Sequence, residues 1–368
     1  MLTRTPQVII VGAGVGGLCA AIALRRSGLE VVILEQATEL REVGAGVLLR
    51  PVAMRALRRL EVGAAIEDAG AAAADAALHN SRGTSLGAGP AEEVVAGVDA
   101  PTVVVHRGLL QTILLAALGQ HVLRLGARCV GVAQDAEGVT VSLADGTTEH
   151  GDLVVGADGL NSQVRTVLVG DGPPRYSGYT AWRAVVPLDR SLADRLRPGE
   201  SWGRGGLFGV ATLGGSQAYW WASARTGEGP GGSLAEEKAA VERRFGIWHE
   251  PIPELIDATL EQAIVRTCQY DRPPLRHWSA GRVGLLGDAA HPMVASLGQG
   301  ACQAIEDAAA LGDAVGAGAD VTSALRAYDA RRASPAAAVA RRSRRVARLA
   351  HLRHPLAVAA RDAFLRLR

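Results

Sequence analysis

A glycine-rich turn near the N-terminus constrains the fold of this 368-residue chain more than any other feature. The apolar, β-branched run Val8–Val11 is typical of a buried parallel strand. The sequence GAGVGG of residues 12–17 follows it, and an Ala-rich helix is predicted over Leu18–Ser27, closed by Gly28. A second apolar strand is predicted at Val31–Leu34. The segment therefore predicts a complete β-α-β unit.

The spacing of the glycines predicts a dinucleotide site. Gly12 permits a tight turn, Gly14 lets the backbone approach a pyrophosphate, and Gly17 lets the helix pack on the strand. The helix N-terminus offers free N–H groups to phosphates. Glu35 ends the second strand, at about the 20-residue distance expected of a carboxylate that binds a ribose. The acid favours the unphosphorylated ribose of FAD or NAD over that of NADP.

Composition sets limits on the class of protein. The chain is 48% hydrophobic with a net charge of +2, which excludes disorder over most of its length. Its length fits about two domains. Of the 39 basic residues only Lys238 is a lysine, so chemistry that needs a lysine amine is disfavoured.

The charges and cysteines argue against several partners. Residues 331–368 carry 11 arginines and one acid, Asp362, so the rest of the chain is mildly acidic and nucleic-acid binding is not expected. The four cysteines lie far apart without metal-ligand spacing, so we expect no metal and a reducing, cytoplasmic location.

The basic tail from Thr322 is predicted to form one or two helices, broken near Pro335 and Pro355. Two interpretations stay open for it. The helices are either solvated, or they make weak contact with an anionic membrane or partner. The apolar side chains expected on one face for that contact are Val346, Leu349, Leu352 and Leu356.

The middle of the chain changes character. Residues 176–278 hold 12 of the 14 aromatic residues, with strand-like alternation at Tyr179–Val186 and Ala218–Ala224. Buried strands are predicted on either side, at Leu153–Gly156 and Arg282–Leu286, and a helix at Ala301–Val315. The aromatic-rich window is therefore expected to be a β-rich second domain inserted into the first.

Two further motifs follow the flanking strands. Asp158-Gly159 comes directly after the strand at 153–156, where such a pair usually makes a turn. Gly287-Asp288 follows the strand at 282–286 and leads through Gly298-Gln299-Gly300 into the next helix. A carboxylate there can accept sugar hydroxyls, and the helix start can stabilise an anion.

The three motifs in this order resemble those of the class A FAD-dependent aromatic hydroxylases, a family of flavoprotein monooxygenases. The subgroup is similar to the salicylate, 3-hydroxybenzoate and urate hydroxylases. The resemblance covers essentially the whole chain and includes residues 40–47, 106–110 and 179–183. It implies an α/β fold with a Rossmann-like FAD-binding domain, an inserted β-sheet substrate domain and C-terminal helices. The expected segments are 1–75, 101–172 and 276–330 for the FAD-binding domain, 76–100 and 173–275 for the substrate domain, and 331–368 for the basic helices.

The resemblance also implies the cofactor contacts. Residues 12–17 would hold the pyrophosphate of FAD, Glu35 the adenosine ribose, and Asp288 the ribityl hydroxyls. Arg107 would reach the phosphates or the ribityl chain, and Asp158 would touch FAD near the path of NADH or NADPH. The start of the helix at 298–302 would face the pyrimidine end of the flavin, where the reduced form is anionic. The full expected set is Gly12, Gly14, Val15, Gly16, Gly17, Glu35, Gln36, Arg41, Val47, Arg107, Val130, Asp158, Asp288, Leu297, Gly298, Gln299, Gly300, Ala301 and Cys302.

The substrate residues are less sharply indicated. Tyr219 and Trp221 share one face of a predicted strand and Trp220 the other. The candidates for the substrate pocket are Arg50, Trp182, Arg183, Phe208, Tyr219 and Trp221. Urate is disfavoured, because Leu207 stands where the resemblance expects the arginine of an Arg–Tyr pair.

Two further residues of the late motif carry separate expectations. His291 is expected to be structural. Ala295 stands where the family usually has proline, so a less rigid flavin-facing loop is expected.

The expected function is hydroxylation of an aromatic or other electron-rich small molecule. In the cycle that the resemblance implies, NADH or NADPH reduces FAD, O2 adds to give a C4a-hydroperoxyflavin, and its distal oxygen attacks the substrate. No catalytic side chain is identified, and the protein is expected to be a monomer or homodimer. Two alternatives stay open: a flavin oxidoreductase of the same fold performing epoxidation, dehydrogenation or oxidative cyclisation, and a flavin-binding protein without turnover.

Overall fold

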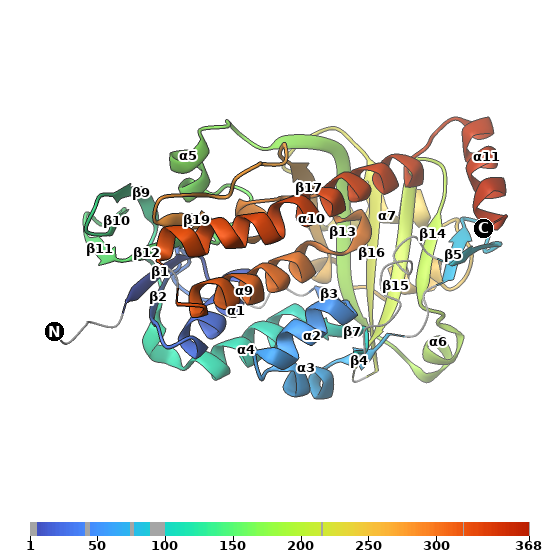
Figure 1. Ribbon diagram of the computed structural model, residues 1–368. Helices are drawn as coiled ribbons and strands as arrows, with labels where there is room; N and C mark the ends of the chain where they lie inside the picture. The colour runs from blue at the N-terminus through green and yellow to red at the C-terminus, as the bar shows by residue number, and fades with distance from the viewer. Residues whose placement is uncertain are drawn as a thin grey trace.

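Two large β-sheets at opposite ends of the molecule organise the chain (Figure 1). The computed structural model describes residues 6–40, 45–73, 77–88, 100–214, 216–318 and 320–367. The first sheet has six strands in the order β18 (Ser279–Ala280), β19 (Val283–Leu285), β12 (Leu153–Gly156), β1 (Gln7–Val11), β2 (Glu30–Leu34) and β8 (Leu123–Arg124). All neighbours pair in parallel except β18 with β19. Parallel pairing brings together segments that are far apart in the sequence.

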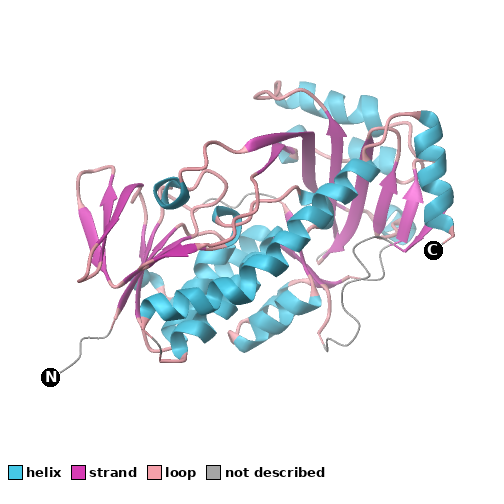
Figure 2. Cartoon of the chain, turned by 45° about the horizontal axis from the view of Figure 1, so that its top comes forward, coloured by secondary structure: helices cyan, strands magenta, loops and turns pink. Residues whose placement is uncertain are grey.

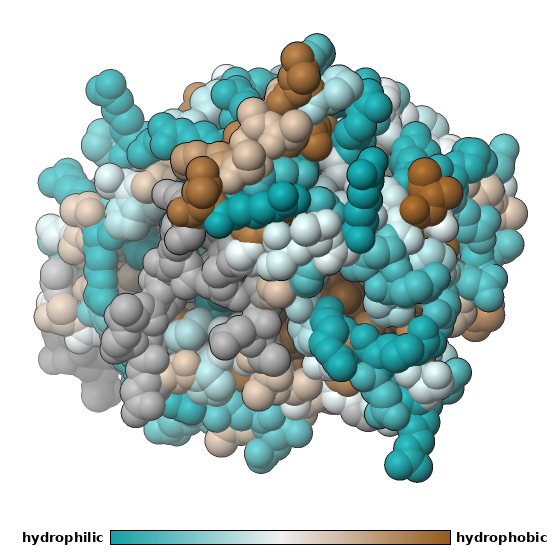
Figure 3. All heavy atoms as spheres, turned by 90° about the vertical axis from the view of Figure 1, so that its right-hand side faces the viewer, coloured by the Kyte–Doolittle hydropathy of each residue, from teal (hydrophilic) through white to brown (hydrophobic). Residues whose placement is uncertain are grey.

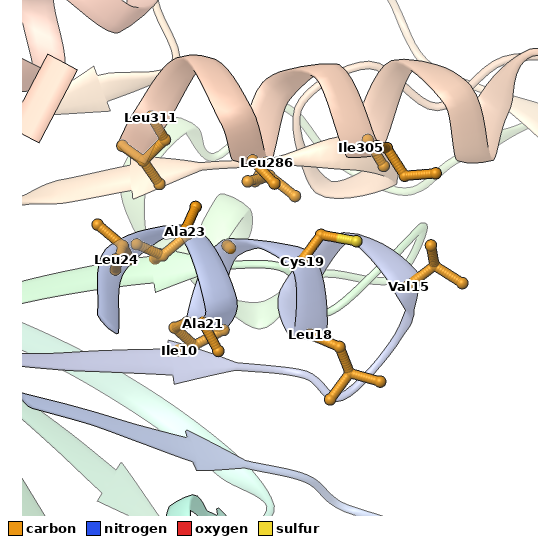
Figure 4. Close-up of a cluster of buried hydrophobic side chains, with 14 of the residues drawn as sticks. Ile10, Val15, Leu18, Cys19, Ala21, Ala23, Leu24, Leu286, Ile305 and Leu311 are labelled. Atoms are coloured by element: carbon orange, nitrogen blue, oxygen red, sulfur yellow. The ribbon is translucent and has the colours of Figure 1, made fainter. Parts of the chain in front are cut away.

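Helix α1 (Val15–Arg26) packs between this sheet and helix α9 (Gly300–Gly316). Figure 4 shows Ile10 and Leu18 on the sheet side of the cluster, and Leu286, Ile305 and Leu311 on the α9 side. The Ala-rich sequence of α1 lets α1 and α9 pack closely, and a Cβ on Gly16 would lie 2.6 Å from Leu286 Cδ2. The predicted β-α-β unit is thus present, with the helix ending one residue before Ser27.

Smaller elements complete this part of the molecule. An antiparallel sheet joins β11 (Thr148–Gly151), β10 (Val139–Leu143) and β9 (Cys129–Gln134), and another joins β3 (Gly46–Leu49), β7 (Val103–His106) and β4 (Ala71–Ala72). The helices around them are α2 (Pro51–Arg59), α3 (Gly63–Ala69), α4 (Arg107–Leu118), η2 (Gln120–Val122) and α5 (Gln163–Val169).

The second sheet has seven strands, which include most of the aromatic-rich window. Their order is β17 (Val265–Asp271), β13 (Arg175–Pro187), β16 (Gln217–Arg225), β15 (Gly206–Leu213), β14 (Gly199–Trp202), β5 (Ala77–Asn80) and β6 (Ser85–Ala88). The helical segments beside it are α6 (Arg190–Arg195), α7 (Leu234–Phe245), α8 (Ile252–Asp257) and η3 (Glu261–Ala263). Phe245 and Leu255 of α7 and α8 share a buried cluster with Trp220 of β16. These helices therefore cover one face of the sheet and leave the other face turned toward the first sheet's layer.

Helix α10 (Val321–Ala350) runs from one sheet to the other, as Figure 2 shows. At its start Tyr328 donates a hydrogen bond to the Leu285 carbonyl of β19, at 3.0 Å. Further along, Ser343 Oγ donates to the Val294 carbonyl at 2.6 Å, and Arg344 forms an ion pair with Asp271 of β17. A single helix thus fastens both sheets and the loop between them, which contains η4 (Gly287–Ala289) and η5 (Ala295–Leu297).

The prediction of a break near Pro335 is wrong, because α10 continues through it. Pro335 lies on the exposed side of the helix, where the carbonyl that loses its hydrogen bond can turn to water. The break near Pro355 is confirmed, since α11 (Pro355–Arg366) begins there. The predicted boundary at residue 330 falls inside α10, and the division into domains stays a prediction.

A buried charge cluster joins α9, α10 and the loop after β19. Asp307 Oδ2 lies 2.5 Å from His291 Nε2, and Asp307 Oδ1 accepts a hydrogen bond from Arg332 Nε at 2.7 Å. The Asp307 side chain is fully buried, and Arg332 also pairs with Glu306 at 3.0 Å. His291 therefore lies in a structural cluster rather than at an exposed reacting position.

Removing the central carboxylate should strongly destabilise the fold. We expect Asp307→Ala to lower the free energy of unfolding by about 3–5 kcal/mol, because it leaves buried cations uncompensated. Asp313→Ala is the matched control on the same helix, where ion pairs to Arg59 and Arg331 are partly exposed and worth less than about 1 kcal/mol each. Urea unfolding measures both, and equal costs would contradict the assignment.

The same cluster predicts how stability depends on pH. Burial opposes the charged form of His291, but the Asp307 carboxylate outweighs this and raises the pKa of His291 above its ordinary value. The contribution of the His291–Asp307 pair to stability is therefore complete below the unfolded pKa of His291, about 6.5. It is lost as pH rises through the higher pKa of His291 in the folded protein. The stability difference between the native chain and His291→Asn should shrink from pH 6 upward, and a difference that grows would contradict the pairing.

Candidate cofactor and substrate site

Of the four glycines between the end of β1 and the first turn of α1, Gly12 and Gly17 have backbone atoms where a side chain would lie, whereas Gly14 does not. Gly12 has φ +106°, and a Cβ there would lie 2.5 Å from the Ala157 carbonyl oxygen. A Cβ on Gly17 would lie 2.0 Å from the Gly12 carbonyl oxygen. Gly14 has φ −69°, and its Cβ would meet no atom within 4 Å. The space beside Gly14 at the N-terminus of α1 is therefore open, and a helix N-terminus favours an anion such as a phosphate.

Glu35 joins the end of β2 to this turn. Its Oε2 accepts a hydrogen bond from the Ala13 amide at 2.8 Å, and its Oε1 accepts one from the Ala37 amide at 2.8 Å. Gln36 beside it is exposed. Of the other residues expected here, Val15 is buried in α1, and Arg41 lies outside the described residues.

Asp158, after β12, caps helix α5. It accepts hydrogen bonds from Ser162 Oγ at 2.5 Å, from the Gln163 amide at 2.7 Å and from the Val164 amide at 3.2 Å. Burial raises the pKa of Asp158, and these bonds oppose the rise. Gln163 Nε2 also donates to the Val130 carbonyl at 3.2 Å, so Val130 lies beside the same helix start.

Asp288 lies where the loop after β19 meets the start of α9. Solvent reaches its side chain, although the surrounding protein still desolvates the carboxyl and raises the pKa of Asp288. The charges of His291 and Arg107 oppose this rise, which places Arg107 of α4 within electrostatic reach. A Cβ on Gly300 would lie 3.9 Å from Asp288 Oδ1. Asp288 is thus a solvent-accessible carboxylate beside the start of α9.

The start of α9 faces the same region. Leu297 is buried, whereas Gly298 is exposed, has φ +62° and would place a Cβ in open space. The first turn itself contains no acidic residue, and Asp288 from the preceding loop is the carboxylate that lies beside the positive end of the helix dipole. Gln299 is buried, while Gly300 and Ala301 are half-buried.

Cys302 connects α9 to the end of β3. Its Sγ donates to the Leu48 carbonyl at 3.3 Å and accepts from the Arg50 amide at 3.4 Å. Burial raises the pKa of Cys302 to about 11, so the thiol stays protonated. The bond positions Arg50, and the β3 strand that contains Val47, against the start of α9.

Tyr219, Trp221 and Arg183 meet on the sheet face turned toward β3. The Tyr219 ring packs on the backbone of Gly46, where a Cβ would lie 2.4 Å from Tyr219 Cγ. The Tyr219 and Trp221 ring centroids are 5.4 Å apart. Burial raises the pKa of Tyr219, while the charge of Arg183, a hydrogen bond from it and the charge of Arg107 lower it. The phenol therefore lies within the field of two arginines.

Trp182 and Phe208 lie on the opposite face. Trp182 Nε1 donates to Glu237 Oε2 of α7 at 2.6 Å, and Phe208 stacks on Trp220 with centroids 5.3 Å apart. Neighbouring residues of a strand alternate between faces, so Trp182 points away from the side that Arg183 occupies. The structure does not bring these two candidates to the others, and we leave them out of the pocket.

Glu200 of β14 was not predicted from the sequence as a site residue. Its Oε1 accepts from Trp221 Nε1 at 2.8 Å and its Oε2 from Trp202 Nε1 at 2.9 Å. Burial raises the pKa of Glu200, while the two indole hydrogen bonds and the charge of Arg50 oppose the rise. Glu200 thus fixes the orientation of Trp221. Its only sequence signal is an acid two residues before a tryptophan in a four-residue strand.

The loop with Ala295 is fastened by hydrogen bonds. The Ala295 amide donates to Gln269 Oε1 at 2.8 Å, and Gln269 Nε2 donates to Ser223 Oγ at 3.1 Å. Proline has no N–H and cannot make the first bond. This contact supplies part of the restraint that a proline ring would otherwise give.

The described ranges contain no group of three or more His, Cys, Asp or Glu side chains arranged to hold a metal ion. Within them no helix is both long and apolar enough to cross a bilayer.

The glycines offer a test that separates folding from ligand binding. We expect Gly14→Ala to leave the unfolding midpoint of the ligand-free protein unchanged but to weaken flavin binding at least about tenfold, because the new methyl occupies the phosphate space. Gly17→Ala should lower stability itself, since its Cβ meets the Gly12 carbonyl. Flavin titration and thermal unfolding distinguish the two, and a Gly14→Ala variant with undiminished flavin affinity would refute the placement.

Comparisons with known proteins show what this chain is similar to. The family described as "FAD binding domain" matches residues 5–343. The aurachin C monooxygenase/isomerase of Stigmatella aurantiaca is 41% identical over 360 residues, covering 98% of this chain and 94% of that protein. The 3-amino-4-hydroxybenzoate 2-monooxygenase PtnB3 of Streptomyces platensis is 37% identical, with coverages of 93% and 88%. The solved structure of Klebsiella pneumoniae HpxO complexed with FAD and uric acid matches with a TM-score of 0.91 at 29% identity, covering 99% of this chain and 93% of that one.

Proposed function

The chain belongs to the FAD-binding domain family, and from this we propose that it is a monooxygenase that uses NADH or NADPH and O2 to hydroxylate an aromatic or other electron-rich small molecule. The family, the α/β fold and the FAD-dependent monooxygenase function predicted from the sequence are confirmed. The observation that carries the proposal is that Arg107 acts on both Asp288, which lies beside Gly300 at the start of α9, and Tyr219. From this we infer one path that runs from the open turn at Gly14 past Asp288 and the start of α9 to Tyr219.

The residues on this path fit FAD. We assign the pyrophosphate to the space beside Gly14, the adenosine ribose to Glu35 and the ribityl hydroxyls to Asp288, with Arg107 toward the phosphates. The open end of α9 at Gly298 would stabilise negative charge on the pyrimidine side of the ring. The remaining members of the predicted set would line these contacts. When bound, the flavin supplies the hydride acceptance and oxygen activation that no side chain provides.

The sheet face beyond Gly46 would hold the substrate. Leu207, Trp221 and Leu297 share a buried apolar cluster and form one wall. Arg183 donates to Thr267 Oγ1 at 2.8 Å and also bonds Tyr219, so it holds the phenol in place. We infer a flat, largely apolar ring with one hydrogen-bonding substituent near Tyr219. Urate is polar on every edge and suits the Leu207 wall less well.

A second candidate is oxygen insertion followed by rearrangement. The 41% identical relative is named a monooxygenase/isomerase, and the apolar wall can hold a substrate through two steps. Isotope-labelled O2 separates the possibilities. A product with one labelled atom on an unchanged carbon skeleton supports hydroxylation, one on a rearranged skeleton supports the second candidate, and an unlabelled product contradicts both.

The co-substrate and the cellular context are part of the proposal. We expect NADH or NADPH to be consumed, which fits the cytoplasmic location predicted from the sequence. The purified protein should show flavin absorbance and oxidise a nicotinamide faster when an aromatic ligand is added. Failure to bind FAD would overturn the proposal.

The Arg183–Tyr219 pair provides the test of the substrate site. We expect Arg183→Gln and Tyr219→Phe each to lower kcat/KM about tenfold to hundredfold, because a hydrogen bond to a charged group is worth about 1.5–3 kcal/mol. Trp182→Phe is the control: its neighbours lie on the other sheet face, so kcat/KM should stay within about twofold while stability falls. Unchanged activity in both pair variants would exclude this face as the substrate site.

A further inference from the structure

The outward face of α11 is apolar. Leu356 is 75% exposed, Phe364 60% and Leu367 88%, and the exposed Ala360 and Ala363 lie between them. Their spacing of three and four residues places all five on one side of the helix. Figure 3, which views this end of the molecule, shows hydrophobic side chains standing out from a largely hydrophilic surface.

The opposite face of α11 holds the helix in this orientation. Arg361 is only 6% exposed, and its Nη1 donates to the carbonyls of Leu349 and Ala350 at 3.2 Å each. Its guanidinium also lies over the Trp202 ring, 5.6 Å from the centroid. A surface helix normally buries its apolar side chains and exposes its arginines. In α11, Leu365 packs inward, but Arg361 is buried while Leu356 and Phe364 are exposed. The exposed leucines are therefore fixed outward by a buried anchor.

Three arginines lie near the start of this face and one lies at its end. At the start of α11, Arg204 Nε donates to the Arg353 carbonyl at 3.2 Å, and Arg353 Nη2 donates to the Arg225 carbonyl at 3.2 Å. All three side chains are exposed and come from three separate segments of the chain. Arg366, also exposed, lies at the far end of the helix. The apolar face is thus flanked by positive charge.

We propose that the α11 face, comprising Leu356, Ala360, Ala363, Phe364 and Leu367 with the flanking arginines, binds the surface of an anionic lipid bilayer. Apolar side chains would enter the boundary between headgroups and acyl chains, and the arginines would contact lipid phosphates. The helix lies on the membrane rather than across it, because its 12 residues span about 18 Å while the hydrocarbon core is about 30 Å thick.

A second copy of the chain is a less suitable occupant. A two-fold contact through this face would bring the same surface patch together with itself. The arginines would then oppose arginines, whereas lipid phosphates complement them. The charge pattern therefore favours a membrane over a dimer.

Vesicle sedimentation with the full-length, flavin-loaded protein tests the proposal. Vesicles of equal parts phosphatidylglycerol and phosphatidylcholine should bind at least about tenfold more tightly than phosphatidylcholine alone. The double variant Leu356→Ser, Leu367→Ser should lose at least about tenfold of that binding. Arg204→Gln and Arg366→Gln should each lose about fivefold.

Ile247→Ser is the matched control, since Ile247 is 89% exposed and lies in the turn after α7. It should bind the anionic vesicles as the native chain does, and all variants should retain flavin and the native unfolding midpoint. Equal binding to both vesicle types, or no binding, would overturn the proposal. So would sedimentation velocity showing a dimer that the double leucine variant dissociates. Because vesicle binding is measured without turnover, its failure leaves the proposed enzymatic function unaffected.

Discussion

The close contact between β1 and α1 is the constraint on which the rest of the structure depends. Gly17 lies so close to the Gly12 carbonyl that no side chain fits, and a Cβ on Gly12 would lie 2.5 Å from the carbonyl oxygen of Ala157 after β12. These contacts place the start of α1 at the carboxyl ends of β1 and β12. Because α9 packs on the other side of α1, the same contacts fix where α9 begins. The phosphate space and the flavin-facing helix end are therefore positioned by one tightly packed turn.

The second sheet can contribute to the site only because it is held against the unit formed by β1, α1 and α9. Helix α10 is hydrogen-bonded to β19 through Tyr328 and to the intervening loop through Ser343. It forms an ion pair with β17 through Arg344. The buried pair of Asp307 and Arg332 joins α10 to α9 at the level of the loop that carries Asp288. The C-terminal part of the chain is thus a structural clamp across the site. Its last helix, α11, turns an apolar face outward.

Sequence reasoning succeeded where the signal is local. The β-α-β unit, the strand before Asp288 and the helix after Gly298 depend on short runs of apolar residues and on glycines at fixed spacing. The opposed faces of Tyr219 and Trp220 followed from strand alternation. The prediction of a break at Pro335 was wrong, because whether a helix tolerates proline depends on which side of the helix faces water.

The substrate face could not be derived in the same way. Trp182 and Arg183 are neighbours in the sequence, and only strand pairing and the position of α7 decide which one reaches the site. Five of the twelve aromatic side chains in the window pack in the cluster under α7 and α8 rather than around the site, so part of their density marked a core. Glu200 and the contact of Arg183 with Tyr219 arise between strands that are distant in the sequence, and no local pattern encodes them.

The most direct test is a crystal structure of the protein with FAD bound. We expect the pyrophosphate beside Gly14, the ribityl chain within hydrogen-bond reach of Asp288, and the flavin ring between Gly298 and the face that contains Tyr219. A pyrophosphate away from Gly14, or a ring on the side of Trp182, would contradict the assignment of the site.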